Sequence, residues 1–362
     1  MYGEHDYEVL TSAREGLQRQ EDHFGSKQRH DTDGYNIIPF GYCTYRNRSD
    51  DGKFAFNINT ISEKAIVSKF YPVFRFTNAN STFMAEFLNS SPRVKKKLSV
   101  LAVGTSQVVL SFEALKAAKF DLPCKDEQDK IAAFLECLNA RIENQRTLVV
   151  ALKKYKRGVV RTLLSPKRCS IKNVKWTTSR IGDIGTFIKG APLSKADISL
   201  EGTPFILYGE LYTTYSEVIS NVVRKTQASA DKQYYSQIGD VIIPTSGETP
   251  EEISTASCVM LSDIILAGDL NIYRCTQVDG RIMSYILNHV VNDRIARIAQ
   301  GKSVVHVQAA EISKIEITYP DSFSQKTIIA VLAAISDRID QSNAELRLLH
   351  ELRKALLQKL FI

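Results

Sequence analysis

The sequence lacks the features that mark a membrane, secreted or metal-binding protein. No stretch approaches the roughly 18 uncharged apolar residues that a membrane span needs, and the N-terminus has no basic segment followed by an apolar one. The six cysteines form no CxxC pair and no zinc-type spacing with histidine. We therefore expect a cytoplasmic protein with reduced thiols and no metal site.

Recognisable catalytic motifs are also missing. There is no GxxxxGK[ST] phosphate loop, no Asn/Asp-Pro-Pro-Tyr/Phe element of an amino-methyltransferase and no PD…ExK nuclease pattern. Ser246-Gly247-Glu248 lacks the GxSxG frame of a nucleophile. We expect a non-catalytic chain that carries no cofactor of its own.

What the sequence does contain is an ordinary globular composition with a mild excess of bases. Its length of 362 residues suggests two or three folded domains. Its composition, 44% hydrophobic and 24% charged, is that of an ordinary globular protein. The net charge of +7 is a weak indication of an anionic partner.

The chain repeats itself. Residues 104–164 align without a gap on residues 301–361, a shift of 197 that places Gln128 on Gln325. Upstream, Leu88-Asn89 matches Leu287-Asn288 after a two-residue slip. Two copies of one unit are therefore expected, each a mixed domain followed by a long helix.

The two repeated C-terminal segments have apolar residues at alternating steps of four and three, the pattern of a coiled-coil seam. Each predicts a helix of about 35–40 residues, or about 50–60 Å. We expect the two helices to pair antiparallel; the alternative is that each packs only on its own domain. The predicted seam consists of Ile131, Leu135, Leu138, Ile142, Val149, Leu152, Ile328, Leu332, Ile335, Ile339, Leu346 and Leu349.

Polar residues interrupt this seam at matching positions, Gln145 with Ser342 and Lys156 with Arg353. Such residues lower stability and tend to fix register and partner choice. Residues 149–175 also carry nine Lys and Arg and no acid. This stretch favours proximity to a polyanion or an acidic partner, the alternative being a solvated helix end.

The predicted fold class is α+β: two tandem domains, each followed by a long helix. The expected boundaries are residues 1–121 for the first domain, 122–175 for the first helix and a basic linker, 176–318 for the second domain and 319–362 for the second helix. Within the second domain, residues 282–298 have a helical pattern. The first domain starts late, because its equivalent of residues 176–190 would fall before residue 1.

These residues bring one family into view. The run from Leu122-Pro123 through Glu127-Gln128 to Leu135, continuing over residues 152–164, resembles the repeated motifs of the DNA-specificity subunit of type I restriction-modification systems. The second copy is more degraded. It has Ser324 where the first has Glu127, and Ala355 where the first has Gly158.

The resemblance implies two target-recognition domains that each read half of a bipartite double-stranded DNA sequence, with the paired helices setting the spacing. It implies docking to two modification (methyltransferase) subunits that use S-adenosylmethionine, and to restriction-translocase subunits that use ATP and Mg²⁺. Two alternatives stay open: a shortened relative that reads one half-site, and a coiled-coil scaffold that does not bind DNA.

Candidate DNA contacts are loop residues that combine hydrogen-bond donors with aromatic rings beside predicted strands. In the first domain they are Ser12, Arg14, Tyr45, Arg46, Asn47, Arg48, Lys53, Thr105, Ser106 and Gln107. In the second they are Lys189, Tyr208, Glu210, Tyr212, Ser246, Glu248, Lys302 and Ser303.

Overall fold

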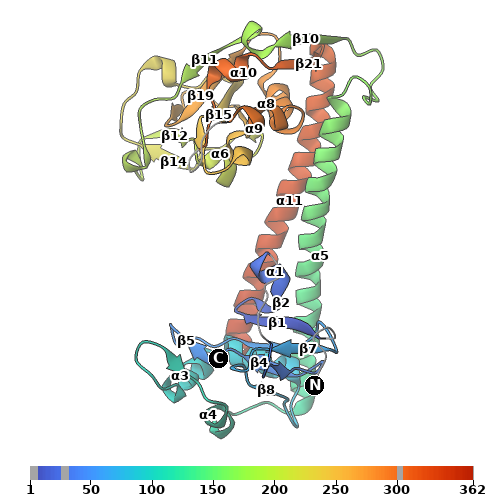
Figure 1. Ribbon diagram of the computed structural model, residues 1–362, viewed down its shortest axis with the longest axis vertical. Helices are drawn as coiled ribbons and strands as arrows, with labels where there is room; N and C mark the ends of the chain where they lie inside the picture. The colour runs from blue at the N-terminus through green and yellow to red at the C-terminus, as the bar shows by residue number, and fades with distance from the viewer. Residues whose placement is uncertain (1–6, 26–31, 300–304, 362) are drawn as a thin grey trace. The chain divides into compact units, whose positions relative to one another are not determined.

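The computed structural model describes residues 7–25, 32–299 and 305–361. The chain divides into two compact units, one made of Met1–Thr147 with Asn343–Ile362 and the other of Leu148–Ser342. The division crosses two long helices, α5 (Lys125–Leu163) and α11 (Ser322–Leu360), so each unit holds a globular domain and a segment of both helices (Figure 1).

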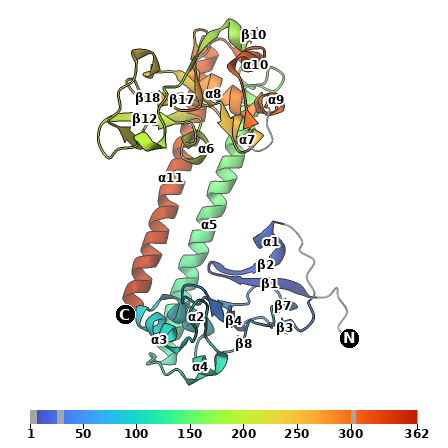
Figure 2. The same cartoon turned by 60° about the vertical axis from the view of Figure 1, so that its left-hand side comes forward.

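Unit 1 contains a four-stranded sheet of order β2-β1-β7-β3, a three-stranded sheet of order β6-β4-β8 and the short pair β5-β9. Its strands are β1 (Glu8–Ala13), β2 (Gly16–Arg19), β3 (Asn36–Ile37), β4 (Cys43–Tyr45), β5 (Arg48–Ser49), β6 (Phe56–Ile58), β7 (Ala65–Val67), β8 (Val73–Phe74) and β9 (Val108–Val109). Its shorter helices are α1 (Gln20–Phe24), α2 (Ser81–Ser90), α3 (Pro92–Leu101) and α4 (Phe112–Ala117). Helix α2 lies against α5 (Figure 2), and Phe83 of α2 and Leu135 of α5 belong to one buried apolar cluster.

Unit 2 is built around a five-stranded sheet of order β11-β19-β15-β17-β13, with a three-stranded sheet β14-β12-β18 and the pairs β10-β21 and β16-β20. Its strands are β10 (Trp176–Arg180), β11 (Gly185–Lys189), β12 (Thr203–Leu207), β13 (Val218–Ile219), β14 (Arg224–Thr226), β15 (Asp240–Pro244), β16 (Ser246–Gly247), β17 (Ser257–Val259), β18 (Ile265–Ala267), β19 (Leu270–Cys275), β20 (Val305–His306) and β21 (Glu316–Pro320). Its shorter helices are α6 (Glu210–Thr213), α7 (Pro250–Ile253), α8 (Gly280–His289), α9 (Asn292–Ile298) and α10 (Ala309–Ser313).

The sheets confirm the repeat. The order β6-β4-β8 in unit 1 matches β17-β15-β19 in unit 2, and the pair β5-β9 matches β16-β20. Helices α2 and α8 each have 10 residues and begin at Ser81 and Gly280, 199 positions apart. This is the two-residue slip that the sequence shows upstream of the helices.

The two units differ at one edge. In unit 2, β11 extends the main sheet beyond β19, and β10 pairs with β21. In the described part of unit 1, the matching strand β8 ends its sheet and no strand precedes β1. The described part of unit 1 therefore has no counterpart of β10 and β11.

Two side chains have the same structural task in both units. The Gln128 side chain accepts a hydrogen bond from the N–H of Asn80 and donates one to the carbonyl of Pro123. Gln325 does the same with the N–H of Asp279 and the carbonyl of Pro320. The repeated glutamine therefore ties the start of each long helix to the N-cap of α2 or α8.

An asparagine on α2 and α8 also repeats its contacts. Asn89 accepts a hydrogen bond from the N–H of Phe56 and donates to its carbonyl, at 2.9 and 2.8 Å. Asn288 bonds both backbone groups of Ala256 in the same way, at 3.1 and 2.6 Å. Each amide satisfies a backbone pair beside the sheet, which fixes the helix against it.

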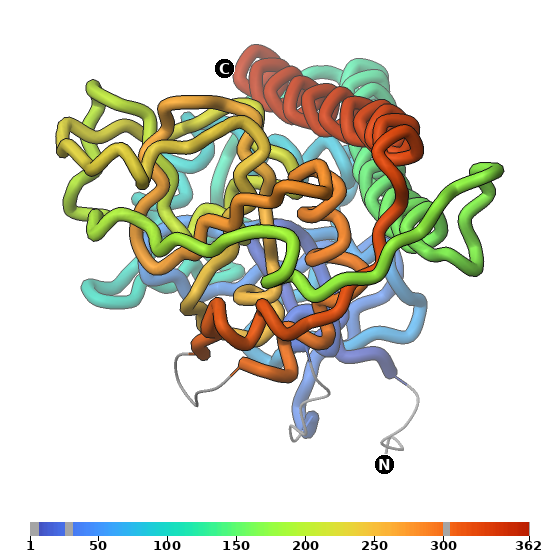
Figure 3. The backbone as a smooth tube through the Cα atoms, turned by 90° about the horizontal axis from the view of Figure 1, so that it is seen from above, coloured from blue at the N-terminus to red at the C-terminus, as the bar shows by residue number. Residues whose placement is uncertain are grey.

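Helices α5 and α11 pack together and run antiparallel, as predicted (Figures 1 and 3). In unit 1, Leu135 clusters with Leu357, and Ile142 with Leu349, so partner numbers fall as the α5 numbers rise. Eight of the predicted seam residues are buried: Leu135, Leu138, Ile142, Val149, Ile328, Leu332, Ile339 and Leu349. The other four are half-buried: Ile131, Leu152, Ile335 and Leu346.

The alternative, that each helix packs on a globular domain, also describes part of the contact. Val160, Leu163, Ile328 and Leu332 belong to the main core of unit 2, together with residues of its sheet such as Tyr273. The helices therefore pair with each other, and the residues near their ends also pack into the apolar cores of the globular domains.

Candidate nucleic-acid interface

The residues after β4 line a hollow on the first domain. The chain leaves β4 at Tyr45, passes through Arg46 and Asn47, and enters β5, which pairs antiparallel with β9. This pairing brings Gln107 beside the 46–48 segment. The hollow has a volume of about 310 Å³ and is lined by Arg46, Asn47, Arg48, Ser68, Phe70, Tyr71 and Gln107. Four of the predicted contact residues therefore meet at one place.

Cations and aromatic rings alternate in this hollow, which we call the arginine hollow. The guanidinium of Arg48 lies 5.0 Å from the centroid of the Phe70 ring, and the Lys69 ammonium lies 5.7 Å from the same ring. A cation over the face of an aromatic ring is attracted by the negative charge density of that face. Burial raises the pKa of Tyr71, while the charge of the nearby Arg46 opposes that rise. Arginine and aromatic faces in this combination bind phosphates, base edges and stacked bases.

An unsatisfied polar group points to a ligand at the same place. The side-chain carbonyl oxygen of Asn47 is buried and has no hydrogen-bond partner among the described residues. A buried polar group without a partner costs about 1–3 kcal/mol, so such groups are rare, and an ordered water or a ligand is one way to satisfy them. Arg46 and Arg48 are exposed beside it.

Acidic residues next to the arginine hollow contact three candidates, Gln107 of the hollow itself and also Arg14 and Lys53. Gln107 donates a hydrogen bond of 2.9 Å to Asp50, and Arg14 forms an ion pair of 2.8 Å with Asp51. Lys53 lies 3.6 Å from the same Asp51 carboxylate. A hydrogen bond from Ser49, assisted by Arg14, lowers the pKa of Asp51 to about 2. A charged Asp51 thus reduces the positive potential that Arg14 and Lys53 offer to DNA.

Two candidates in the first domain are buried, which argues against direct DNA contact. Tyr45 is fully buried, and its hydroxyl donates a 2.9 Å hydrogen bond to the carbonyl of Leu110. Ser12 is also buried and accepts a 2.8 Å hydrogen bond from Asn57. Both lie on strands, where alternate side chains face the core. The remaining two candidates, Thr105 and Ser106, are exposed in the loop before β9.

The second domain buries two of its candidates. Glu210 is 5% exposed, accepts a hydrogen bond from the N–H of Leu207 and forms a 2.6 Å ion pair with Arg224. Ser246 is 4% exposed and donates to Asp269. Their roles in this structure are internal, contrary to the expectation that they face DNA.

The other candidates of this domain are accessible in different degrees. Lys189 and Glu248 are exposed, while Tyr208 and Tyr212 are half-buried. Tyr208 packs on the apolar cluster around Leu266. Lys302 and Ser303 lie outside the described residues.

Three residues of the arginine hollow were not among the sequence candidates: Ser68, Phe70 and Tyr71. They follow β7 and come from a separate loop, so no spacing in the sequence connects them to Arg46. The run Lys69-Phe70-Tyr71, a base followed by two aromatics, was the available signal.

Most basic side chains of the described residues 149–175 are exposed and form no ion pair. Lys156 is buried and forms an ion pair with Glu217. The other eight bases are exposed, and none of these eight described residues forms an ion pair: Lys153, Lys154, Arg157, Arg161, Lys167, Arg168, Lys172 and Lys175. These eight exposed bases are therefore available to an anionic partner.

The described residues hold no group of three or more His, Cys, Asp or Glu side chains arranged to bind a metal ion. Over the same ranges, no helix combines the length and apolar character that a membrane crossing requires. Their six cysteines are all free thiols.

The fold defines a tandem-repeat protein whose two mixed domains are joined through paired helices. A family model described as the type I restriction modification DNA specificity domain matches residues 4–152 and 173–350. These matches cover most of the chain, so the protein belongs to this family. Its role is to provide DNA-sequence specificity in a type I restriction-modification system, a role that implies DNA and methyltransferase partners.

Solved structures share the fold. The S subunit of the type I restriction-modification system from M. genitalium has a TM-score of 0.58 and 16% sequence identity, covering 99% of this chain and 89% of that chain. A structure concerned with complex assembly and conformational transition of the type I R-M system has a TM-score of 0.57 and 17% identity, covering 92% and 84%. A comparison with curated proteins gives no match.

Proposed function

We propose that this chain reads the two halves of a bipartite DNA target, one half with each globular domain. The repeat supports a two-part target, because the two copies of one fold carry different side chains on their loops. Where unit 1 has Arg48-Ser49 in β5, unit 2 has Ser246-Gly247 in β16. Different loop chemistry at the same place in the fold favours two different half-site sequences.

The arginine hollow is the observation that carries the proposal. The guanidinium of Arg48 lies over the Phe70 ring, and its planar set of donors suits bidentate recognition of a guanine edge or a phosphate. Asn47 lines the same hollow, and because its buried side-chain oxygen has no partner among the described residues, rotation of the side chain would offer an acceptor to an exocyclic amino group without breaking a hydrogen bond of that oxygen. We therefore assign the reading of one half-site to Arg46, Asn47, Arg48 and Gln107.

The long helices are proposed to dock two modification subunits, which bind S-adenosylmethionine, and through the assembly the restriction subunits, which use ATP and Mg²⁺. Exposed apolar side chains on the outer faces of the helices support this, because apolar groups at the centre of an interface contribute most to affinity. They include Phe134, Val150, Tyr155, Leu348 and Leu352. In this scheme the chain is non-catalytic and acts in the cytoplasm.

Methylome sequencing tests the reading residues. A host expressing the modification subunits receives the wild-type chain, Arg46→Ala, Arg48→Ala or the control Arg93→Ala. Arg93 is exposed on α3 and does not line the arginine hollow. A base-reading arginine should relax one position of one half-site and cost about 1–3 kcal/mol of binding, whereas a phosphate contact weakens all targets equally. An unchanged methylated sequence in both hollow variants would refute base reading by these arginines.

A second candidate function is a protein that reads only one half-site. The observation that favours it is the first domain's sheet, which has no counterpart of β11 in the described residues. Footprinting of the assembly with its modification subunits separates the candidates. Two protected patches support the bipartite reading, one patch supports the single half-site, and none supports a scaffold without DNA contact.

A further inference from the structure

A basic residue at the same heptad position of each long helix contacts the globular domain of its unit. Lys156 on α5 and Arg353 on α11 are 197 positions apart and occupy matching positions of the repeat. Lys156 forms a 2.7 Å ion pair with Glu217, just before β13. Arg353 forms an ion pair with Glu86 on α2, and its Nε atom donates a 2.6 Å hydrogen bond to Asn139.

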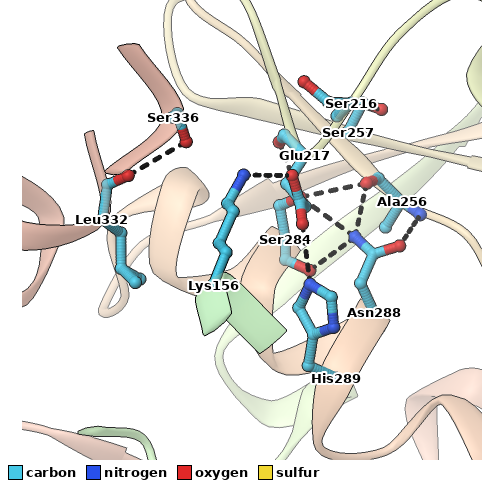
Figure 4. A network of polar contacts seen from close by, with 10 residues as sticks. All are labelled: Lys156, Ser216, Glu217, Ala256, Ser257, Ser284, Asn288, His289, Leu332 and Ser336. Atoms are coloured by element: carbon cyan, nitrogen blue, oxygen red, sulfur yellow. Dashed lines mark hydrogen bonds and ion pairs between the residues drawn. The ribbon is translucent and has the colours of Figure 1, made fainter. Parts of the chain in front are cut away.

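The contact in unit 2 is largely buried and joins Lys156, Glu217 and His289 (Figure 4). The side chains of Lys156, Glu217 and His289 are 10%, 14% and 12% exposed. One Glu217 carboxylate oxygen bonds Lys156, and the other lies 2.7 Å from Nε2 of His289 on α8. The Lys156 ammonium also lies 5.3 Å from the centroid of the Tyr285 ring. Glu217 is therefore held from the helix on one side and from its own domain on the other.

The same position of the short helix meets the basic residue in both units. With the shift of 199 between α2 and α8, Glu86 corresponds to Tyr285. Arg353 pairs with the first and Lys156 lies over the second. Glu86 and Tyr285 differ in chemistry, but each contacts the cation of the long helix in its unit.

Burying an apolar residue at this position would avoid the desolvation cost of a charged one. Desolvating two charges cancels much of their attraction, and apolar replacements of buried ion pairs are often neutral or stabilising. A buried ion pair does, however, accept only one geometry, whereas apolar side chains tolerate sliding. The recurrence of a cation at both positions therefore favours a role in register over a role in stability.

We propose that Lys156 and Arg353 are positioning residues that fix the register of each globular domain on the helix segment of its own unit, and thereby restrict the number of base pairs accepted between the two half-sites. The proposal rests on the bipartite reading proposed above. It assigns spacing specificity to a pair of side chains that do not contact DNA themselves.

The experiment is methylome sequencing of hosts that express the modification subunits with the wild-type chain, Lys156→Met, Arg353→Met or Glu217→Gln. The expected result is unchanged half-site sequences, with methylation of targets whose spacer is one base pair longer or shorter raised about tenfold, the change that 1.4 kcal/mol in binding produces. Lys156→Arg retains a cation and should restore the wild-type spacing.

The matched control is Lys154→Met, which removes the same charge from an exposed position of α5 without breaking an ion pair. It should weaken binding without changing the spacing. Equal relaxation in this control, or wild-type spacing in the folded Lys156 and Arg353 variants, overturns the proposal. A wild-type target without two separated halves overturns the bipartite reading itself. If Lys156→Met does not fold, Arg353→Met carries the test in the other unit.

Discussion

Replacing Glu217 by glutamine should destabilise unit 2 at neutral pH, and the destabilisation should decrease as the pH falls toward 2. Burial raises the pKa of Glu217, but the hydrogen bond from His289 and the charge of Lys156 outweigh burial and lower the pKa from its ordinary value of 4.5 to about 2. Glutamine has nearly the same shape as the protonated carboxyl, so Glu217→Gln imitates the neutral state at every pH.

The size of the effect follows from linkage. A carboxyl with a lower pKa in the folded state stabilises the fold above its unfolded pKa, and this contribution disappears as the pH falls through the folded pKa. For Glu217 it is about 3 kcal/mol at pH 7 and about 2 kcal/mol at pH 3.5, and it approaches zero below pH 2. Removing one partner of a buried ion pair typically costs roughly 3–5 kcal/mol, which agrees with this value.

Urea unfolding followed by tryptophan fluorescence measures the change. The single tryptophan, Trp176, lies in β10 of unit 2, so its signal reports this unit. At a urea dependence of roughly 1–3 kcal/mol per molar, a loss of about 3 kcal/mol moves the midpoint down by about 1 M or more. The control Arg353→Met breaks an ion pair in unit 1 and should leave this transition in place.

Two results would contradict the reasoning. If the Glu217→Gln variant unfolds at the wild-type urea concentration at pH 7, the carboxylate is not stabilised by Lys156 and His289. If the difference between the two proteins is the same at pH 7 and pH 3.5, its origin is not the ionisation of Glu217.

Three further outcomes are expected. Asn288→Ala leaves the N–H of Ala256 without its partner, while the Ala256 carbonyl keeps a 3.0 Å hydrogen bond from Ser284, and should cost about 1–3 kcal/mol, seen as a lower urea midpoint of unit 2. Thiol titration should label the exposed Cys124 at once and the buried Cys43 only after unfolding, because burial raises the pKa of the Cys43 thiol. DNA affinity of the assembled complex should fall steeply with salt, and Lys154→Met should reduce the slope of log affinity against log salt by about 1 if Lys154 contacts a phosphate.

The strongest predictions from sequence concerned the long helices. Steps of four and three place side chains on one stripe whatever the surrounding fold, so residues such as Leu135 and Leu332 could be assigned to the seam and are fully buried. The helical pattern over residues 282–298 was less reliable. The structure divides it into α8, which ends at His289, and α9, which begins at Asn292, and the backbone of Val291 between them departs from helical geometry.

The DNA-contact residues on loops were harder to predict, because the type of a polar or aromatic residue does not show whether its side chain is buried or exposed. Tyr45 and Glu210 were chosen as surface residues, but both are buried with internal partners. Conversely, Phe70 lines the arginine hollow although it is distant in sequence from Arg48, whose guanidinium lies over its ring. Only pairing between β5 and β9 and the turn after β7 decide which side chains meet.

The sequence by itself determined the repeat, the antiparallel helix pair and the family, since periodicity and motif spacing are local properties of the chain. The tertiary structure alone decided which cations are available to DNA. Arg46 and Arg48 remain exposed in the arginine hollow, Arg14 is paired with Asp51, and Lys156 is buried against Glu217. The physical reason is that the strength of a charge at the surface depends on its burial and its partners, and both are set by residues remote in sequence.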